Sequence, residues 1–139
     1  MSTFVIRKCR PEEVHAVLAL WQQAEAAPDV SDTVEDLTHA IVNSPALVLV
    51  AKAQDRLVGS IIGSFDGWRG NIYCLALHPT CRRQGITRAL VAEVEQQLAQ
   101  QGAKRMVVPV EQDHPWAVGF WQSVGYEVLP GMMRFIRDL

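Results

Sequence analysis

The chain has 139 residues, of which 49% are hydrophobic and 20% charged, and its formal net charge is −2 at neutral pH. This length and composition fit a single globular domain, which we expect to span residues 1–139, and they exclude the disordered and fibrous classes. Such a small net charge gives no overall attraction to nucleic acid or to an anionic membrane, so we expect neither as a partner.

The three cysteines, Cys9, Cys74 and Cys81, are far apart and lack the Cys-x-x-Cys or His/Cys spacing of a zinc site. We therefore expect buried or inert thiols and no metal. The N-terminus has no apolar run with a cleavage site, and the chain has no stretch of about 18 apolar residues. These features predict a soluble cytoplasmic protein.

The N-terminal third predicts one strand followed by two helices. Residues 3–9 are rich in β-branched and aromatic types, which favours a strand. Residues 11–27 then place apolar side chains at helical spacing, and this helix is expected to end before Pro28. A capping box that starts at Ser31 or Asp32 predicts a second helix ending near residue 43.

The middle of the chain predicts a hairpin, a third strand and a long helix. Two apolar runs, 46–53 and 56–65, are separated only by Gln-Asp, and the turn DGWRG leads to a strand at 71–78. Apolar residues at steps of four then predict a helix over 86–101 that ends at Gly102.

The C-terminal part predicts a strand at 103–110, a short helix at 113–125 and one or two last strands within 126–139. A strand–helix–strand crossover over 71–110 requires a parallel pair, whereas the hairpins are antiparallel. The fold class is therefore α/β (mixed α+β), with a mixed, mostly antiparallel sheet of six to seven strands and about four helices.

Residues 81–90, CRRQGITRAL, crowd three arginines around Gly85 at the expected start of a helix. A helix N-terminus already carries partial positive charge, so each cation there costs about 0.3–1 kcal/mol unless an anion binds. A strand, a glycine turn and a helix form a common phosphate site, although a solvated charged face is the alternative. Neither Gly-Lys-Ser/Thr nor Gly-x-Gly-x-x-Gly is present, so the known nucleotide loops are not supported.

Residues 71–98 (NIYCLALHPTCRRQGITRALVAEVEQQL) resemble the acyl-CoA motif of the GNAT N-acetyltransferase superfamily, and 119–128 (GFWQSVGYEV) resemble its second signature. The turn FDGWRG, 65–70, is similar to that of a small bacterial subgroup, the YpeA-type acetyltransferases. The resemblance implies a GNAT-like fold with a splayed parallel strand pair. It also implies direct transfer of an acetyl group from acetyl-CoA to a primary amine within a ternary complex.

The resemblance further implies which residues bind acetyl-CoA. The pantetheine arm would lie along Leu75, Ala76 and Leu77, and the N–H of Leu75 would stabilise the oxyanion that develops on the thioester. His114 matches a position that reaches the cofactor in relatives, with a surface cap as the alternative. The pyrophosphate cradle would comprise Arg82, Arg83, Gln84, Gly85, Ile86, Thr87 and Arg88.

Two positions depart from the family pattern. Thr87 stands where Gly or Ala is usual, and its β-branch predicts weaker or rearranged phosphate binding. Trp121 stands where many relatives carry a tyrosine that acts as general acid. Because an indole N–H has no useful acidity, that role is empty here, and we expect Trp121 to pack in the core beside Phe120.

The remaining catalytic candidates are carboxylates. Glu111, at the end of the strand that contains Pro109, is our candidate general base, acting directly or through water; a solvated carboxylate is the alternative. Trp21, Asp29 and Asp32 flank a loop and are predicted to contact a cationic acceptor, although an acidic loop can simply be solvated.

Tyr73 and Tyr126 alternate with core positions and are expected to pack. The function predicted from the sequence is therefore an acetyl-CoA-dependent N-acetyltransferase, monomeric or homodimeric, acting on an unidentified amine. The alternatives are a non-catalytic acyl-CoA-binding or sensing module and a simple phosphate or nucleotide binder.

Overall fold

The computed structural model describes residues 3–24, 30–114 and 116–139. Internal contacts divide the chain into two compact units, Met1–Val107 and Val108–Leu139. The first unit is built on a five-stranded sheet in the order β1-β2-β3-β4-β5. Its strands are β1 (Val5–Lys8), β2 (Leu47–Ala53), β3 (Arg56–Phe65), β4 (Gly70–Leu77) and β5 (Met106–Val107).

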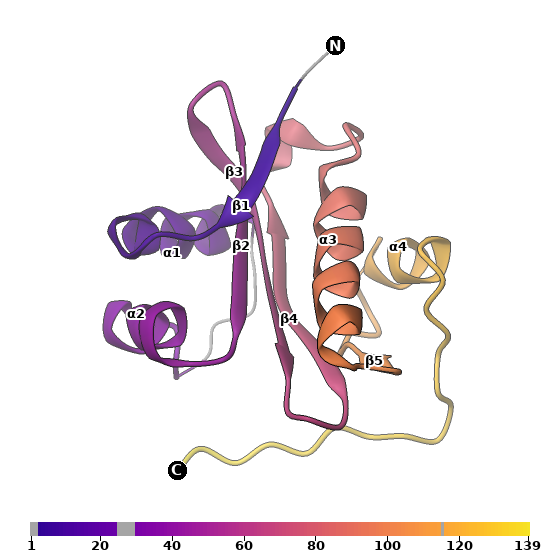
Figure 1. Ribbon diagram of the computed structural model, residues 1–139. Coiled ribbons are helices and arrows are strands. Elements are labelled where there is room, and N and C mark those ends of the chain that lie inside the picture. Colours follow the sequence, from indigo (N-terminus) through magenta and orange to yellow (C-terminus); the bar gives the residue numbers. More distant parts are fainter. Residues whose placement is uncertain (1–2, 25–29, 115) are drawn as a thin grey trace. The chain divides into compact units, whose positions relative to one another are not determined.

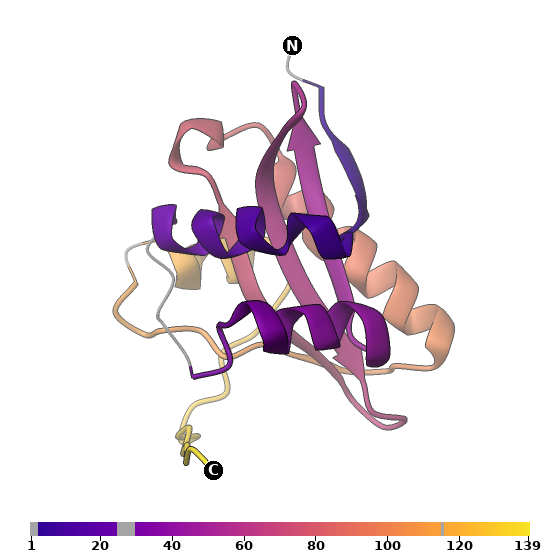
Figure 2. The same cartoon turned by 90° about the vertical axis from the view of Figure 1, so that its left-hand side faces the viewer.

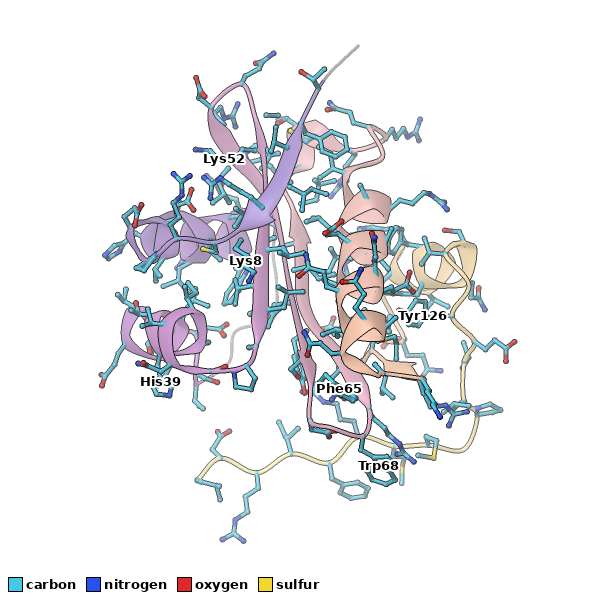
Figure 3. All side chains as sticks on the ribbon, viewed as in Figure 1. Lys8, His39, Lys52, Phe65, Trp68 and Tyr126 are labelled. Atoms are coloured by element: carbon cyan, nitrogen blue, oxygen red, sulfur yellow. The ribbon has the colours of Figure 1, made fainter. Side chains whose placement is uncertain are left out.

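The first four strands pair antiparallel, and β5 pairs parallel to β4. The hairpin of β2 and β3 turns at Gln54 and Asp55, whose φ angles of 53° and 62° are the left-handed values that a tight two-residue turn requires. The predicted hairpins and the predicted parallel pair are therefore confirmed. In Figure 3, Trp68 lies at the turn between β3 and β4.

Three helices cover the sheet of the first unit. The helices α1 (Val14–Gln23) and α2 (Val34–Asn43) lie against one face, and α3 (Ile86–Gln101) lies against the other (Figures 1 and 2). The α1–α2 face is filled by one apolar cluster that includes Val17, Leu20 and Val50. The sheet is thus buried on both faces, as its almost continuous apolar strands require.

On the α3 face, β3 presents glycines where the helix approaches. A Cβ at Gly63 would lie 2.6 Å from Cγ1 of Val94, and one at Gly59 would lie 3.2 Å from Leu90. The absence of side chains at these two positions lets α3 pack directly on the strand. The helix ends as predicted at Gly102, whose φ of 113° is a left-handed cap.

The helix ends on the α1–α2 side differ slightly from expectation. Pro11–Glu13 form a short 3-10 helix (η1) where the first turn of the predicted helix was expected, and α1 follows it and ends at Gln23, before Pro28 as predicted. The cap of α2 is Thr33, whose Oγ1 accepts from the N–H of Asp36 at 3.1 Å, rather than Ser31 or Asp32. Threonine offers the same hydroxyl acceptor, and its extended backbone at φ −122° suits an N-cap.

The second unit contains α4 (Ala117–Ser123), where a short helix is predicted. The last strands expected within 126–139 are wrong, since the described residues of that segment form no strand. The predicted strand 103–110 shortens to Met106–Val107, so the described sheet has five strands instead of six or seven. The mixed α/β fold and its four α-helices among the described residues agree with the sequence prediction.

Candidate active site

The middle of β4 carries a β-bulge at the position predicted to hold the thioester. The register with β3 pairs Ile62 with Tyr73 and then Ser60 with Ala76, so two residues of β4, Cys74 and Leu75, lie opposite one residue of β3. Cys74 takes a φ of 54°, a left-handed value that is uncommon outside glycine. Such a bulge redirects backbone groups out of the ladder.

The other edge of β4 is open over most of its length. β5 pairs with β4 only at Gly70 and Asn71. The backbone of residues 72–77 therefore has no neighbouring strand on that side within the described sheet. This edge includes Leu75, Ala76 and Leu77, the residues predicted to bind an extended ligand arm.

The open edge leads into a tight loop before α3. Pro79–Cys81 form a short 3-10 helix (η2), which is capped by Nδ1 of His78 accepting from the N–H of Thr80 at 3.2 Å. After it, Arg83 has a φ of 66° and Gly85 a φ of 79°. A Cβ built at Gly85 meets no atom within 4 Å, so its backbone faces open space.

The start of α3 has the properties of an anion site. The first bond within the helix runs from the N–H of Ala89 to Gly85 O at 3.0 Å, so the N–H groups of Ile86 and Thr87 have no partner within the helix. Arg82 and Arg83 are exposed and form no ion pair with another described residue. Backbone donors, the helix dipole and two arginines therefore meet at this end of α3.

The other residues of the predicted cradle follow the same segment. Gln84 and Arg88 are exposed, and Thr87 is half-buried. Ile86 is fully buried, so it contributes its backbone alone while its side chain anchors the helix in the core. The cradle residues thus form one continuous stretch of chain from the end of η2 into the first turn of α3.

Three further candidates belong to the second unit. Glu111 is exposed, and its backbone carbonyl accepts from the N–H of His114 at 3.2 Å. His114 packs edge-on against Trp116, and its Nδ1 is buried without a hydrogen-bond partner among the described residues. Trp121 packs edge-on against Phe120, with ring centroids 5.2 Å apart, as the sequence predicts.

The sequence comparisons identify the family. The pattern of the Acetyltransferase (GNAT) family matches residues 14–126 of this chain. The chain is 32% identical over 124 residues to an acetyltransferase of Pectobacterium atrosepticum, covering 89% of this chain and 88% of that protein. The chain belongs to the GNAT family. An acetyltransferase of Yersinia pestis is 29% identical and covers 96% of both chains.

Solved structures agree with this GNAT assignment. The chain superposes with a TM-score of 0.82 on the PaiA N-acetyltransferase of Thermoplasma acidophilum in complex with coenzyme A, at 18% identity and 91% coverage of both chains. An aminoglycoside N-acetyltransferase in complex with CoA gives the same TM-score at 16% identity, with 100% of this chain and 97% of that chain covered. The protein is thus an acetyltransferase enzyme with the GNAT fold.

Of the three residues predicted to contact the acceptor of this GNAT enzyme, the structure describes Trp21 and Asp32. Trp21 is a correction, because it is only 6% exposed and its Nε1 already donates to Oγ of Ser60 at 2.9 Å, both in the core. Asp32 is half-buried near the start of α2. Asp29 lies outside the described residues.

One residue on β4 was misjudged from the sequence: Tyr73 is 43% exposed instead of packed. Cys74, where a buried or inert thiol was expected, is exposed. Cys74 lies in the bulge, which interrupts the two-residue alternation on which the prediction relied, whereas Tyr73 precedes the bulge and lies where the α1–α2 face of the sheet becomes accessible. Tyr126 does pack, edge-on against Trp121 at 5.1 Å, and Cys9 is buried as expected.

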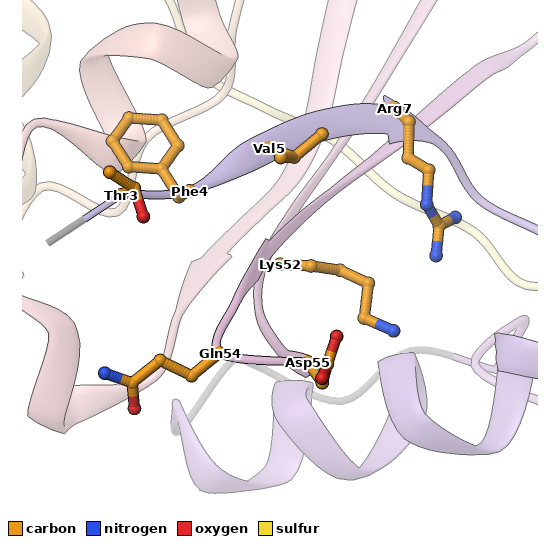
Figure 4. A pocket seen from close by; sticks show the side chains of 7 residues that line it. All are labelled: Thr3, Phe4, Val5, Arg7, Lys52, Gln54 and Asp55. Atoms are coloured by element: carbon orange, nitrogen blue, oxygen red, sulfur yellow. The ribbon is translucent and has the colours of Figure 1, made fainter.

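A surface pocket of about 420 Å³ lies elsewhere in the first unit, between β1 and the β2–β3 turn (Figure 4). Its charged side chains include Arg7 and Lys52, which both reach Glu13 at 2.6 and 3.9 Å. None of the predicted site residues lines it.

Residues 3–24, 30–114 and 116–139 offer neither a cluster of metal-ligating side chains nor a membrane-spanning helix. No group of three or more His, Cys, Asp or Glu side chains there could hold a metal ion. No helix in those ranges is long and apolar enough to cross a membrane.

Proposed function

We propose that this acetyltransferase binds acetyl-CoA along β4 and at the start of α3, and transfers the acetyl group directly to a primary amine. One observation carries the proposal: the edge of β4 over residues 72–77, beside which the described sheet has no further strand, leads through η2 to the start of α3, where backbone N–H groups and the exposed Arg82 and Arg83 lie together. Neighbours with the same fold, solved with coenzyme A, support it.

The start of α3 fits a pyrophosphate. Gly85 leaves open space beside its backbone, and the N–H groups of Ile86 and Thr87 follow directly. Arg82 and Arg83 would balance the phosphate charges, which explains cations at the positive end of a helix dipole. Thr87 adds a hydroxyl that can donate a hydrogen bond where a smaller residue is usual in the family.

The bulge of β4 fits the reacting carbonyl. The N–H of Leu75, released from the β3 register, would donate to the thioester oxygen and stabilise negative charge as the amine attacks. Glu111, directly or through water, would accept the proton that the amine loses. The carbon–sulfur bond then breaks, and the thiolate, with an ordinary pKa of about 8.5, takes a proton from water.

The acceptor is proposed only as a primary amine. One neighbour of the same fold is an aminoglycoside N-acetyltransferase, which supports an amine acceptor for this chain. Asp32 is a candidate contact for the ammonium form of that amine before it loses its proton.

The test substitutes one glycine in the cradle and one matched glycine outside it. Gly85→Glu places a carboxylate where the pyrophosphate would lie. Gly67→Glu is the control, since Gly67 also has positive φ and open surroundings but lies in the β3–β4 turn. Calorimetry with coenzyme A and thiol release with acetyl-CoA and an amine panel give the readouts.

We expect Gly85→Glu to abolish coenzyme A binding and thiol release, whereas Gly67→Glu keeps both. Circular dichroism should show the same fold in both variants, because a Cβ at either glycine meets no atom within 4 Å and both positions have a positive φ. Unchanged coenzyme A affinity in Gly85→Glu would overturn the proposed site.

A further inference from the structure

The side chain of Tyr73 lies on the α1–α2 face of the sheet. Antiparallel partners share a face, and Tyr73 is paired with Ile62, which packs against the α1–α2 core. The next residue of β3, Gly63, faces the opposite way, because a Cβ there would meet Val94 of α3. The register therefore fixes the face of Tyr73 independently of its exposure.

Two polar residues lie beside Tyr73 on the same face. Ser64 is paired with Asn71, and each is two residues along its strand from Ile62 and Tyr73. Ser64 and Asn71 are half-buried, and Tyr73 is 43% exposed. We call Ser64, Asn71 and Tyr73 the polar shelf.

The polar shelf begins where the α1–α2 face of the sheet becomes accessible. One pair further along, Ser60 and Ala76 are buried, and Ser60 is bonded to Trp21 of α1. From Tyr73 onward the face is accessible, although both α1 and α2 lie across it (Figure 2). An accessible surface thus borders directly on the buried core.

The polar shelf is close to the proposed reacting carbonyl. Tyr73 precedes the bulge and is two residues from Leu75, a separation of about 6–7 Å along a strand. A tyrosine side chain spans a similar distance. A molecule resting on the shelf would therefore have its amine next to the carbonyl that Leu75 binds.

The two strand segments that form the shelf carry hydrogen-bonding groups but no charged side chain. Residues 57–65 of β3 and 70–77 of β4 contain no Asp, Glu, Lys or Arg. The phenol, amide and hydroxyl of the shelf both donate and accept hydrogen bonds, and the phenol ring offers an apolar face. Such a surface can hydrogen-bond the hydroxyl groups of a ligand and pack against its carbon skeleton. A second ammonium group would be desolvated there without a counter-charge.

We propose that Tyr73 is a specificity-determining residue that contacts the acceptor, and that the polar shelf selects a hydroxylated monoamine of the amino-sugar type over a polyamine. This inference rests on the proposed function, because it uses Leu75 to locate the reaction. It adds the chemical class of the acceptor and a residue that recognises it.

The test compares glucosamine, cyclohexylamine and spermidine as acceptors at saturating acetyl-CoA. Cyclohexylamine offers a six-membered ring without hydroxyl groups, and spermidine offers several ammonium groups. The variants are Tyr73→Ala, which removes the ring, and Tyr73→Phe, which removes only the hydroxyl. Trp68→Ala is the control, because Trp68 is an exposed aromatic residue at the β3–β4 turn, off the shelf (Figure 3).

We expect the wild type to prefer glucosamine by kcat/KM about tenfold or more. Tyr73→Ala should lose most of that preference through a higher KM for glucosamine, and Tyr73→Phe should lose a smaller part of it. The KM for acetyl-CoA should stay unchanged in both variants, and Trp68→Ala should behave as the wild type.

Spermidine or cyclohexylamine preferred by the wild type, no turnover of glucosamine, or a preference unaffected by Tyr73→Ala would each overturn the inference. Coenzyme A binding, measured separately by calorimetry, distinguishes a failure of the polar-shelf inference from a failure of the proposed function. Intact binding with any of these results overturns the polar shelf alone, whereas a wild type that does not bind coenzyme A overturns the proposed function and the shelf with it.

Discussion

The indole Nε1 of Trp21 donates a hydrogen bond of 2.9 Å to Oγ of Ser60, and both residues are buried. This bond joins the last turns of α1 to the middle of β3. Ser60 is paired with Ala76, the first paired residue after the bulge. The aromatic residue that resembles a substrate contact in the sequence therefore holds α1 against the strand pair that forms the bulge.

Breaking this bond should cost stability. Trp21→Phe leaves the Ser60 hydroxyl without its donor, and Ser60→Ala leaves the indole N–H without an acceptor, each in the core. We expect each change to lower the free energy of unfolding by about 1–3 kcal/mol. Urea unfolding of both variants and of the double variant measures it, and the double variant should cost less than the sum. Purely additive effects would show that the bond contributes nothing.

The close approach of α3 to β3 gives a second prediction. Gly63→Ala places a Cβ 2.6 Å from Cγ1 of Val94, so the helix or the strand must shift. We expect a loss of about 1–3 kcal/mol, as for other overpacked cores, measured by urea unfolding. Gly119→Ala is the matched control.

Gly119 lies within α4, where an added Cβ meets no atom within 4 Å. Because alanine favours helix more than glycine does, this variant should be unchanged or more stable by up to about 1 kcal/mol. Gly63→Ala with wild-type stability would mean that α3 does not pack on β3 as closely as described.

The fold was predictable where local signals agree. Apolar runs around Gln54 and Asp55 define the hairpin, and Gly102 ends α3 where its apolar stripe stops. The candidate anion site at the start of α3 was equally visible, because the arginines around Gly85 conflict with the helix dipole unless an anion is bound.

The errors have physical causes as well. A bulge depends on the pairing of two strands, and the cover over a sheet face depends on distant helices, so the sequence of β4 alone does not reveal that Cys74 and Tyr73 are exposed. Trp21 was misjudged because its partner, Ser60, is 39 residues away. The strand expected in residues 126–139 relied on β-propensity, which is decided by pairing and burial rather than by residue type.

The reactivity of the cysteines toward an alkylating reagent can test the proposed binding mode of coenzyme A. Cys9 is buried, so its thiol is inaccessible to reagents. Burial also raises the pKa of Cys9 to about 11, so the thiol stays protonated at neutral pH. Cys74 is exposed and precedes Leu75, so coenzyme A bound along β4 should shield it. We expect iodoacetamide to modify Cys74 and not Cys9, and saturating coenzyme A to slow the modification of Cys74 severalfold.

Peptide mapping by mass spectrometry separates the two sites, and Cys9 serves as the internal control. Modification of Cys74 at the same rate with and without saturating coenzyme A would contradict the proposed path of the ligand along β4. A reaction at Cys9 comparable with that at Cys74 would instead contradict the burial of the first strand's end.

The last prediction concerns acid stability. Both oxygens of Glu13 accept from the guanidinium of Arg7, at 2.8 and 2.6 Å, and Oε1 also accepts from the N–H of Arg10 at 2.9 Å. The Arg7 guanidinium lowers the pKa of Glu13 from its ordinary 4.5 to about 2, mainly through these hydrogen bonds. The ionised carboxylate of Glu13 in η1 is thus linked to Arg7 in β1 by two hydrogen bonds.

Because the pKa of Glu13 is lower in the folded than in the unfolded chain, its contribution to stability is complete above about pH 4.5 and is lost as the pH falls toward 2. Glu13→Gln should therefore be less stable than the wild type by about 2 kcal/mol at pH 7. The difference should shrink steadily as the pH falls, since the wild-type carboxyl then becomes neutral like the amide. Urea unfolding of both proteins at several pH values between 7 and 2.5 measures it. A difference independent of pH over that range would show that the Arg7–Glu13 pair does not set the pKa of this carboxyl.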